Sequence, residues 1–122
     1  MKKYFDYNLF DWVLVNGEPF QVCSLTRKKV GIHTRQDRIC YLRRNEIEPM
    51  LVTEEFLIKN DFKLKDDYQG YKQYYNYNDS VGLSFSGVNY YTVVNNKVRY
   101  INYVHELQLM YKWHEVTRDW II

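Results

Sequence analysis

Two His-Glu pairs near the C-terminus, His105-Glu106 and His114-Glu115, are the residues whose types suggest metal chemistry most directly. Helices that bind zinc carry two histidines four residues apart, which places both imidazoles on one face. Here the two histidines are nine positions apart, and at about 100° per residue they lie on opposite sides of a helix. We therefore expect no metal site, with His105 in a helix-capping region and His114 in an interface or in the core.

Two other patterns resemble sites of known chemistry. Cys23, His33 and Cys40 supply only three ligands and no Cys-x-x-Cys knuckle, so both thiols are expected to be small buried hydrophobic groups. The segment Gly82–Gly87 resembles a nucleophile elbow, but it lacks the second glycine of that motif and lies on an alternating strand. No phosphate loop or dinucleotide fingerprint is present. The sequence therefore predicts a protein that is not an enzyme and that needs no cofactor.

The strongest candidate site is a basic cluster between positions 27 and 44. The whole chain has a net charge of only +2, yet this stretch holds seven basic residues and one acid, Asp37. The basic residues are Arg27, Lys28, Lys29, Arg35, Arg38, Arg43 and Arg44. On hairpin loops they could contact a phosphate backbone, with Tyr41 or His33 available for stacking. The alternative is a solvated rim that keeps the protein soluble.

The basic cluster falls within four predicted short strands. These strands cover Asp11–Val15, Phe20–Leu25, Lys29–Thr34 and Arg38–Arg43, a spacing typical of a small SH3-like barrel. Between the first two strands we expect a four-residue loop that pairs Val15 with Phe20 and keeps Pro19 out of the ladder. The alternative is a two-residue Asn16-Gly17 turn.

A helix and a second group of strands follow the connector at Pro49. Thr53 offers an N-cap for a short helix over Glu54–Asn60, and Asp66-Asp67 are interpreted as a solvated turn. The predicted meander then has four strands, Tyr71–Tyr77, Val81–Ser86, Tyr90–Val94 and Lys97–Asn102. An Asn95-Asn96 hairpin pairs Val93 with Val98 and Tyr91 with Tyr100. This Tyr-rich sheet is either a recognition surface or a face covered by the C-terminal helix.

The C-terminal helix is predicted from about Val104 to Glu115. Its face of Val104, Leu107, Met110 and Tyr111 is enough to cover a sheet. Burying a large apolar side chain is worth roughly 1.5–3 kcal/mol, so apolar residues outside that face favour a homodimer interface. These residues are Leu109, Trp113, Trp120, Ile121 and Ile122. The alternative is a tail that folds back over the first barrel.

Together these elements predict an α+β protein. Residues 1–50 form an SH3-like small β-barrel, and residues 51–122 form the short helix, the four-stranded antiparallel meander and the C-terminal helix packed on it. We expect the two parts to make one compact unit.

The sequence also indicates a compartment. Two cysteines are too few for a disulfide framework, and Asp6, Asn8 and Asp11 interrupt the apolar stretch that a signal peptide would need. No apolar run approaches the roughly 20 residues of a membrane helix. We expect a cytoplasmic protein that makes no membrane contact.

Three short segments resemble known proteins. They are Asp11-Trp12-Val13 with Asn16–Phe20, Glu48-Pro49 with Thr53-Glu54-Glu55, Leu57, Lys59 and Phe62, and Val104–Gln108 with Tyr111. Together they resemble small proteins of phages and mobile elements of Bacteroides-type gut bacteria. Two features depart from that group, since Asp61 replaces a usual glycine and the Thr-Gly step after Lys112 is missing. The resemblance implies a phage or mobile-element origin and a bacterial cytoplasm, and it implies no activity and no functional residue.

The sequence therefore predicts a non-enzymatic binding module, a phage accessory protein that contacts a host or phage protein or assembles with itself. Three alternatives remain open. The chain binds nucleic acid through the Arg27–Arg44 cluster, or it sequesters a small nucleotide signal as an oligomer, or it is a component of the virion.

Overall fold

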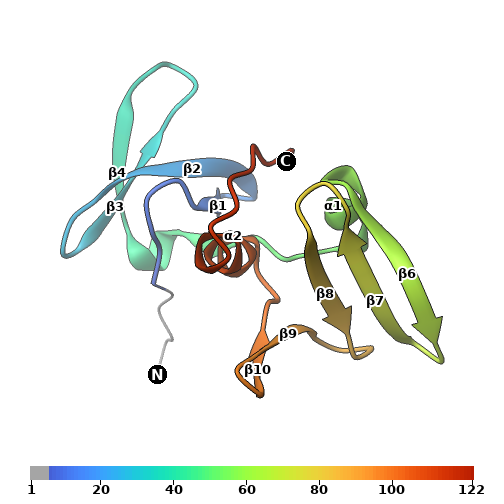
Figure 1. Cartoon of the computed structure of the whole chain (residues 1–122). Helices are drawn as coiled ribbons and strands as arrows, with labels where there is room; N and C mark the ends of the chain where they lie inside the picture. Colours follow the sequence, from blue (N-terminus) through green and yellow to red (C-terminus); the bar gives the residue numbers. More distant parts are fainter. Residues whose placement is uncertain (1–5) are drawn as a thin grey trace. The chain divides into compact units, whose positions relative to one another are not determined.

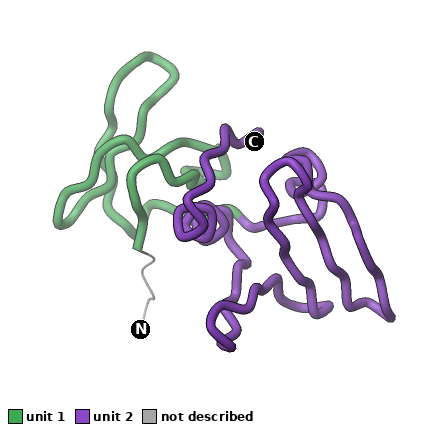
Figure 2. Tube along the Cα trace, in the orientation of Figure 1, with its two compact units in different colours: residues 1–50 green, residues 51–122 purple. Residues whose placement is uncertain are grey.

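The computed structural model describes residues 6–122, and within them the fold is α+β with ten strands in two antiparallel sheets and two α-helices. The chain divides into two compact units, Met1–Met50 (unit 1) and Leu51–Ile122 (unit 2), as Figure 2 shows. None of the helices in this described range has the length and apolarity needed to cross a bilayer.

Unit 1 is built on one five-stranded antiparallel sheet with the order β4-β3-β2-β1-β5 (Figure 1). Its elements are β1 (Trp12–Val15), β2 (Glu18–Leu25), β3 (Lys29–His33), β4 (Ile39–Arg43), a 3-10 turn η1 (Arg44–Glu46) and β5 (Glu48–Pro49). The inward-facing residues form one apolar core, Tyr7, Val13, Val22, Val30, Ile32 and Ile47. The residues between them in sequence, such as Gly31 and Tyr41, therefore belong to the outer face of the sheet.

The sheet of unit 1 is open, and the predicted SH3-like barrel is not confirmed. A closed barrel needs its edge strands to pair, and within the described residues β4 and β5 do not. β5 has only two residues, and Pro49 has no N–H to donate to a further strand. A strand of this kind ends the sheet instead of extending it.

The prediction of a four-residue loop between β1 and β2 is wrong. Val15 pairs with Glu18 and Val13 with Phe20, so the connection is the two-residue Asn16-Gly17 turn, with φ of 52° and 79°. The residues that flank such a turn form a hydrogen-bonded pair, so the next pair, Leu14 opposite Pro19, is a non-hydrogen-bonded one. Pro19 therefore fits the ladder because no N–H is needed there.

Gly31 marks the tightest point of unit 1. β2 carries a register shift between Val22 and Ser24, and this irregularity brings Ser24 opposite Gly31. A Cβ on Gly31 would lie 2.9 Å from the Cβ of Ser24 and 3.0 Å from Cε1 of Tyr41. Only glycine leaves room for these two neighbours.

Unit 2 also contains one five-stranded antiparallel sheet, with the order β10-β9-β8-β7-β6. Its elements are α1 (Glu54–Lys59), β6 (Phe62–Tyr68), β7 (Tyr71–Asn76), β8 (Val81–Phe85), β9 (Tyr90–Val94), β10 (Lys97–Tyr100) and α2 (Val104–Trp113). The predicted four-stranded meander is therefore one strand short, because Asp66-Asp67 belong to β6 and are not a turn. β6 is exposed after Phe62 and shifts register between Leu64 and Asp66, so the alternation in polarity of Phe62–Lys65 does not continue through Asp66 and Asp67.

Two local predictions in unit 2 are confirmed. Val93 pairs with Val98 and Tyr91 with Tyr100, across an Asn95-Asn96 turn whose φ values of 51° and 63° are both positive. Thr53 caps α1, because its Oγ1 accepts a hydrogen bond of 3.1 Å from the Phe56 N–H.

A buried polar network joins the parts of unit 2. Asp79 Oδ2 accepts hydrogen bonds from Asn76 Nδ2, the Tyr111 hydroxyl and Arg118 Nη1, each 2.9 Å long. Arg118 Nη2 reaches Asp61 Oδ2 at 2.8 Å, just after α1. The network thus connects β7, the turn after it, α2 and the C-terminal segment.

The C-terminal segment is itself part of the packing of unit 2. The Trp120 ring stacks on Phe56 of α1, with centroids 5.8 Å apart, and meets the Tyr111 ring edge-on at 4.7 Å. The side chain of Asn60 bonds both backbone groups of Ile121, at 2.7 and 2.8 Å. These contacts bury apolar surface of Trp120 within the chain.

Replacing Gly31 by alanine should destabilise the protein because the new methyl group collides with Ser24 and Tyr41. We expect the free energy of unfolding in urea to fall by about 1–3 kcal/mol. Gly82→Ala is the matched control, since its Cβ would lie 3.5 Å from Tyr75, an ordinary contact. We expect the control to change stability by less than about 0.5 kcal/mol. Equal unfolding midpoints for the two variants would contradict the close packing around Gly31.

Asp79→Ala should destabilise unit 2 much more strongly, because it leaves Arg118 and two further donors without their shared acceptor. The Arg118 side chain is only 9% exposed. We expect a loss of about 3–5 kcal/mol in the free energy of unfolding, measured by urea titration. Asp67→Ala on exposed β6 is the control and should change it by less than about 0.5 kcal/mol. A small effect at Asp79 would show that the network does not hold unit 2 together.

Candidate functional site

One end of the β3–β4 hairpin gathers four of the predicted basic residues around a pocket. Lys28 and Lys29 lie where β3 begins, Arg43 ends β4 directly opposite Lys29, and Arg44 begins η1. Together with Asn45, these residues line a pocket of about 510 Å³. The strand pairing therefore brings together residues that are up to 16 positions apart in sequence.

Side-chain to backbone hydrogen bonds fix the two turns that present these cations. Thr26 Oγ1 accepts a 3.0 Å bond from the Lys29 N–H, which shapes the turn between β2 and β3. Glu46 Oε1 accepts a 3.0 Å bond from the Arg43 N–H, which sets the start of η1. No carboxylate among residues 6–122 forms an ion pair with any of the four cations. The pocket is therefore lined by four cationic side chains that form no ion pair within the described residues.

Arg44 adds a more specific feature. Its Nη1 is buried, and within residues 6–122 it has no hydrogen-bond partner. Buried guanidinium nitrogens are nearly always hydrogen-bonded, and an unsatisfied donor costs about 1–3 kcal/mol. An anion that entered this pocket and reached Nη1 would remove that cost.

The other predicted cations do not join the pocket. Arg27 lies in the adjoining β2–β3 turn, whereas Arg35 and Arg38 lie in the turn at the far end of β3 and β4. β3 has five residues, so the two ends of the hairpin are about 13 Å apart. Arg35 is also 3.7 Å from Glu18 Oε2. The sequence cluster is therefore two groups in space, one of which forms the pocket.

Tyr41 lies on the outer face of β4, two residues before Arg43. It is 46% exposed, and its hydroxyl is 3.2 Å from Ser24 Oγ across β3. His33, the other residue considered for stacking, forms a 2.8 Å contact with Asp37 Oδ1 at the far end of the hairpin. Only Tyr41 therefore combines an exposed ring with a place near the pocket.

The side chains predicted to form a homodimer interface differ in exposure. Trp113 is 52% exposed at the end of α2 and Ile121 is 54% exposed, whereas Leu109, Trp120 and Ile122 are half-buried. Trp120 already packs on Phe56 and Tyr111. The structure thus singles out Trp113 as the large side chain free for a partner, and the homodimer stays a prediction.

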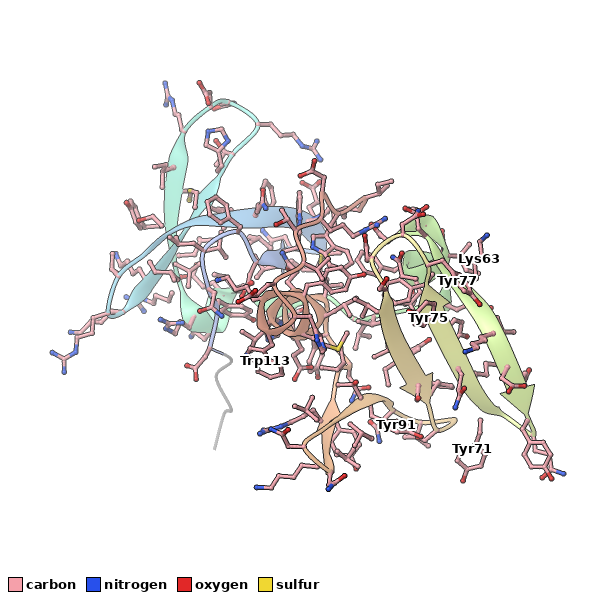
Figure 3. All side chains as sticks on the ribbon, viewed as in Figure 1. Lys63, Tyr71, Tyr75, Tyr77, Tyr91 and Trp113 are labelled. Carbon is pink, nitrogen blue, oxygen red and sulfur yellow. The ribbon has the colours of Figure 1, made fainter. Side chains whose placement is uncertain are left out.

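The tyrosines of unit 2 serve both faces of its sheet. Tyr74, Tyr90 and Tyr111 are buried, whereas Tyr68, Tyr71, Tyr77 and Tyr100 are exposed. Figure 3 shows Tyr75 and Tyr77 beside Lys63 at one end of the sheet and Tyr71 towards the other end. The rings of Tyr75 and Tyr77 meet at 4.8 Å. Some tyrosines of unit 2 are therefore buried and others exposed, and a recognition role for the exposed ones stays a prediction.

A second polar cluster ties α1 to the sheet of unit 2. The Tyr74 hydroxyl donates a short hydrogen bond to Glu54 Oε2, and Lys72 Nζ lies 3.3 Å from the same oxygen. The hydrogen bond from Tyr74, aided by Lys72, lowers the pKa of Glu54. Burial and that bond raise the pKa of Tyr74. This arrangement holds a carboxylate charged and a phenol protonated, which suits a structural contact and not proton transfer.

Several predictions about histidine and cysteine need correction. His114 is exposed after the last turn of α2 and so is not in the core, whereas His105 is buried and its pKa is lowered to about 4 by desolvation. Cys40 is exposed because β4 is an edge strand, although Cys23 is half-buried. In the described range no three His, Cys, Asp or Glu side chains converge as metal ligands would.

Sequence reasoning found the cations of the pocket but not their division or the role of Gly31. The sequence does contain a signal for the division of the basic cluster, since the polar turn Arg35–Asp37 separates the predicted strands that carry its two ends. No family model, curated protein or solved structure matches this chain.

Proposed function

We propose that this chain is a non-enzymatic binding protein whose unit 1 binds nucleic acid through its phosphates at the basic pocket. The observation that carries the proposal is the convergence of Lys28, Lys29, Arg43 and Arg44 on one pocket, none of them in an ion pair with a described carboxylate. Four like charges repel one another, so a bound polyanion stabilises the arrangement. The guanidinium groups also match a phosphate with two parallel hydrogen bonds.

The distribution of charge along the hairpin favours a polymer over a small nucleotide. Arg35 and Arg38 lie in the turn beyond the other end of the same two strands, more than about 13 Å along the hairpin from Lys29 and Arg43. A strand of nucleic acid carries one phosphate about every 3.4 Å of helix axis, so several phosphates match that length. A single nucleotide would reach only one of the two groups.

Replacing two pocket cations should weaken binding and reduce its dependence on salt. For Lys28→Ala with Arg43→Ala we expect at least a tenfold rise in Kd for a labelled single-stranded 20-mer, measured by fluorescence anisotropy near 0.1 M KCl. The slope of log K against log salt should become shallower by about 1.5, since each lost phosphate contact removes about 0.7–0.9.

The matched control is Lys97→Ala with Arg99→Ala, which removes the same two charges from exposed β10 of unit 2. It should leave the slope within error of wild type. Binding that ignores salt, or an equal loss in both double variants, would contradict a phosphate site in unit 1.

A second candidate function is protein binding through unit 2, with a second copy of this chain as the partner. The observation that favours it is Trp113, a large aromatic side chain 52% exposed at the end of a helix. Tryptophan is enriched among the residues that dominate protein interfaces. The phage accessory role in a bacterial cytoplasm that the sequence resemblance suggests is compatible with either function.

Trp113→Ala should convert a dimer to a monomer without changing the fold, measured by analytical ultracentrifugation and far-UV circular dichroism. Tyr68→Ala, at the exposed end of β6, is the control and should behave as wild type. Removing Trp120 is unsuitable as a test, because its contacts with Phe56 and Tyr111 belong to the packing of unit 2. A wild-type protein that sediments as a monomer at every concentration would exclude this dimer.

A further inference from the structure

Tyr41 is held flat on the outer face of unit 1 in a way that an ordinary surface tyrosine is not. Gly31 beneath it is buried although it has no side chain, and a Cβ there would lie 3.0 Å from Tyr41 Cε1. The hydroxyl of Tyr41 lies 3.2 Å from Ser24 Oγ on β2. The ring therefore spans β3, fixed at both ends, and its 46% exposure comes from the side turned away from the sheet.

Tyr41 lies on the same strand as Arg43, one of the residues that line the basic pocket. Tyr41 and Arg43 are two residues apart on β4, so their side chains leave the same face about 7 Å apart. Lys29 is opposite Arg43, and Gly31 is opposite Tyr41. The outer face of the hairpin thus presents a pair of cations and, two residues along each strand, an aromatic ring that packs over Gly31.

We infer that Tyr41 is a stacking platform for a base whose phosphate lies in the pocket, and that the ligand is therefore single-stranded nucleic acid. This inference rests on the proposed function of unit 1. Proteins that bind single strands combine a basic groove with aromatic side chains on which bases stack. In a duplex the faces of the bases are covered by their neighbours, so a flat ring on a sheet finds no base to stack on.

Neighbouring side chains do not offer the same surface. The His33 imidazole contacts Asp37 in the turn at the far end of the hairpin, and Ile39 has no aromatic face. Ile39 is 50% exposed, and its Cγ2 would lie 3.1 Å from a Cβ on Gly31. It borders the platform and can contact the edge of a stacked base.

The test compares three labelled probes of equal length. They are a single strand, the same strand with every base removed, and a duplex. The abasic strand keeps the phosphates and lacks the faces of the bases. We expect wild type to bind the normal strand about 5- to 150-fold more tightly than the abasic one, the range measured for one stacked base. The duplex should bind with the affinity of the abasic strand or more weakly.

Two variants separate stacking from a merely structural role of the ring. Tyr41→Phe keeps the ring and should retain the preference for bases. Tyr41→Leu covers Gly31 without an aromatic face, and it should abolish the preference while leaving the abasic affinity and the salt slope unchanged. Photocrosslinking of a 5-iodouracil strand to wild type, with mass spectrometry of the product, should place the crosslink on Tyr41 and needs no variant to fold.

The outcomes distinguish the two proposals. Equal binding of the normal and abasic strands by wild type, or a preference that survives in a folded Tyr41→Leu variant, overturns the stacking inference and leaves the phosphate site standing. A crosslink that forms only outside unit 1 also overturns it. Failure of all three probes to bind in a salt-dependent way overturns the proposed function itself.

Discussion

A single carboxylate oxygen, Oδ2 of Asp79, is the point on which unit 2 depends. It accepts three hydrogen bonds, from Asn76, Tyr111 and Arg118. A charged group in a partly buried place is stable only when its partners are all present, so the parts of the chain that carry those partners must assemble together. The aromatic packing of Trp120 then closes over the network. The polar contacts determine which segments meet, and the apolar contacts supply the driving force.

Hairpins were predictable where backbone and side-chain patterns agree. At Asn95-Asn96 both residues tolerate positive φ and the flanking residues alternate, so the register followed from the sequence. At Asn16-Gly17 the presence of Pro19 suggested a longer loop, because the sequence does not show which residue pairs of a sheet are hydrogen-bonded and so require a backbone N–H. β6 was missed for a related reason. An exposed edge strand with a bulge buries little on either face, so its period of two covers only Phe62–Lys65 and stops at Asp66.

The candidate site was predictable in composition but not in arrangement. A run of basic residues between positions 27 and 44 is visible in the sequence, and Tyr41 could be named as an aromatic neighbour. The separation into a pocket and a far turn depends on strand pairing. The fixed position of Tyr41 depends on the register shift near Ser24, which only a three-dimensional description provides. Gly31 carried no sequence signal beyond being a glycine within a strand.

The long span between the partners of unit 2 has a consequence for its synthesis. Asn60 bonds Ile121, and the two residues are 61 positions apart. During translation, α1 and β6 leave the ribosome well before Trp120, and synthesis proceeds at about 5–20 residues per second. For several seconds Phe56 therefore lacks its contact with Trp120, and Asp79 lacks its hydrogen bond from Arg118. The nascent unit 2 therefore exposes apolar surface during that interval, whereas every strand of unit 1 is already available to pair.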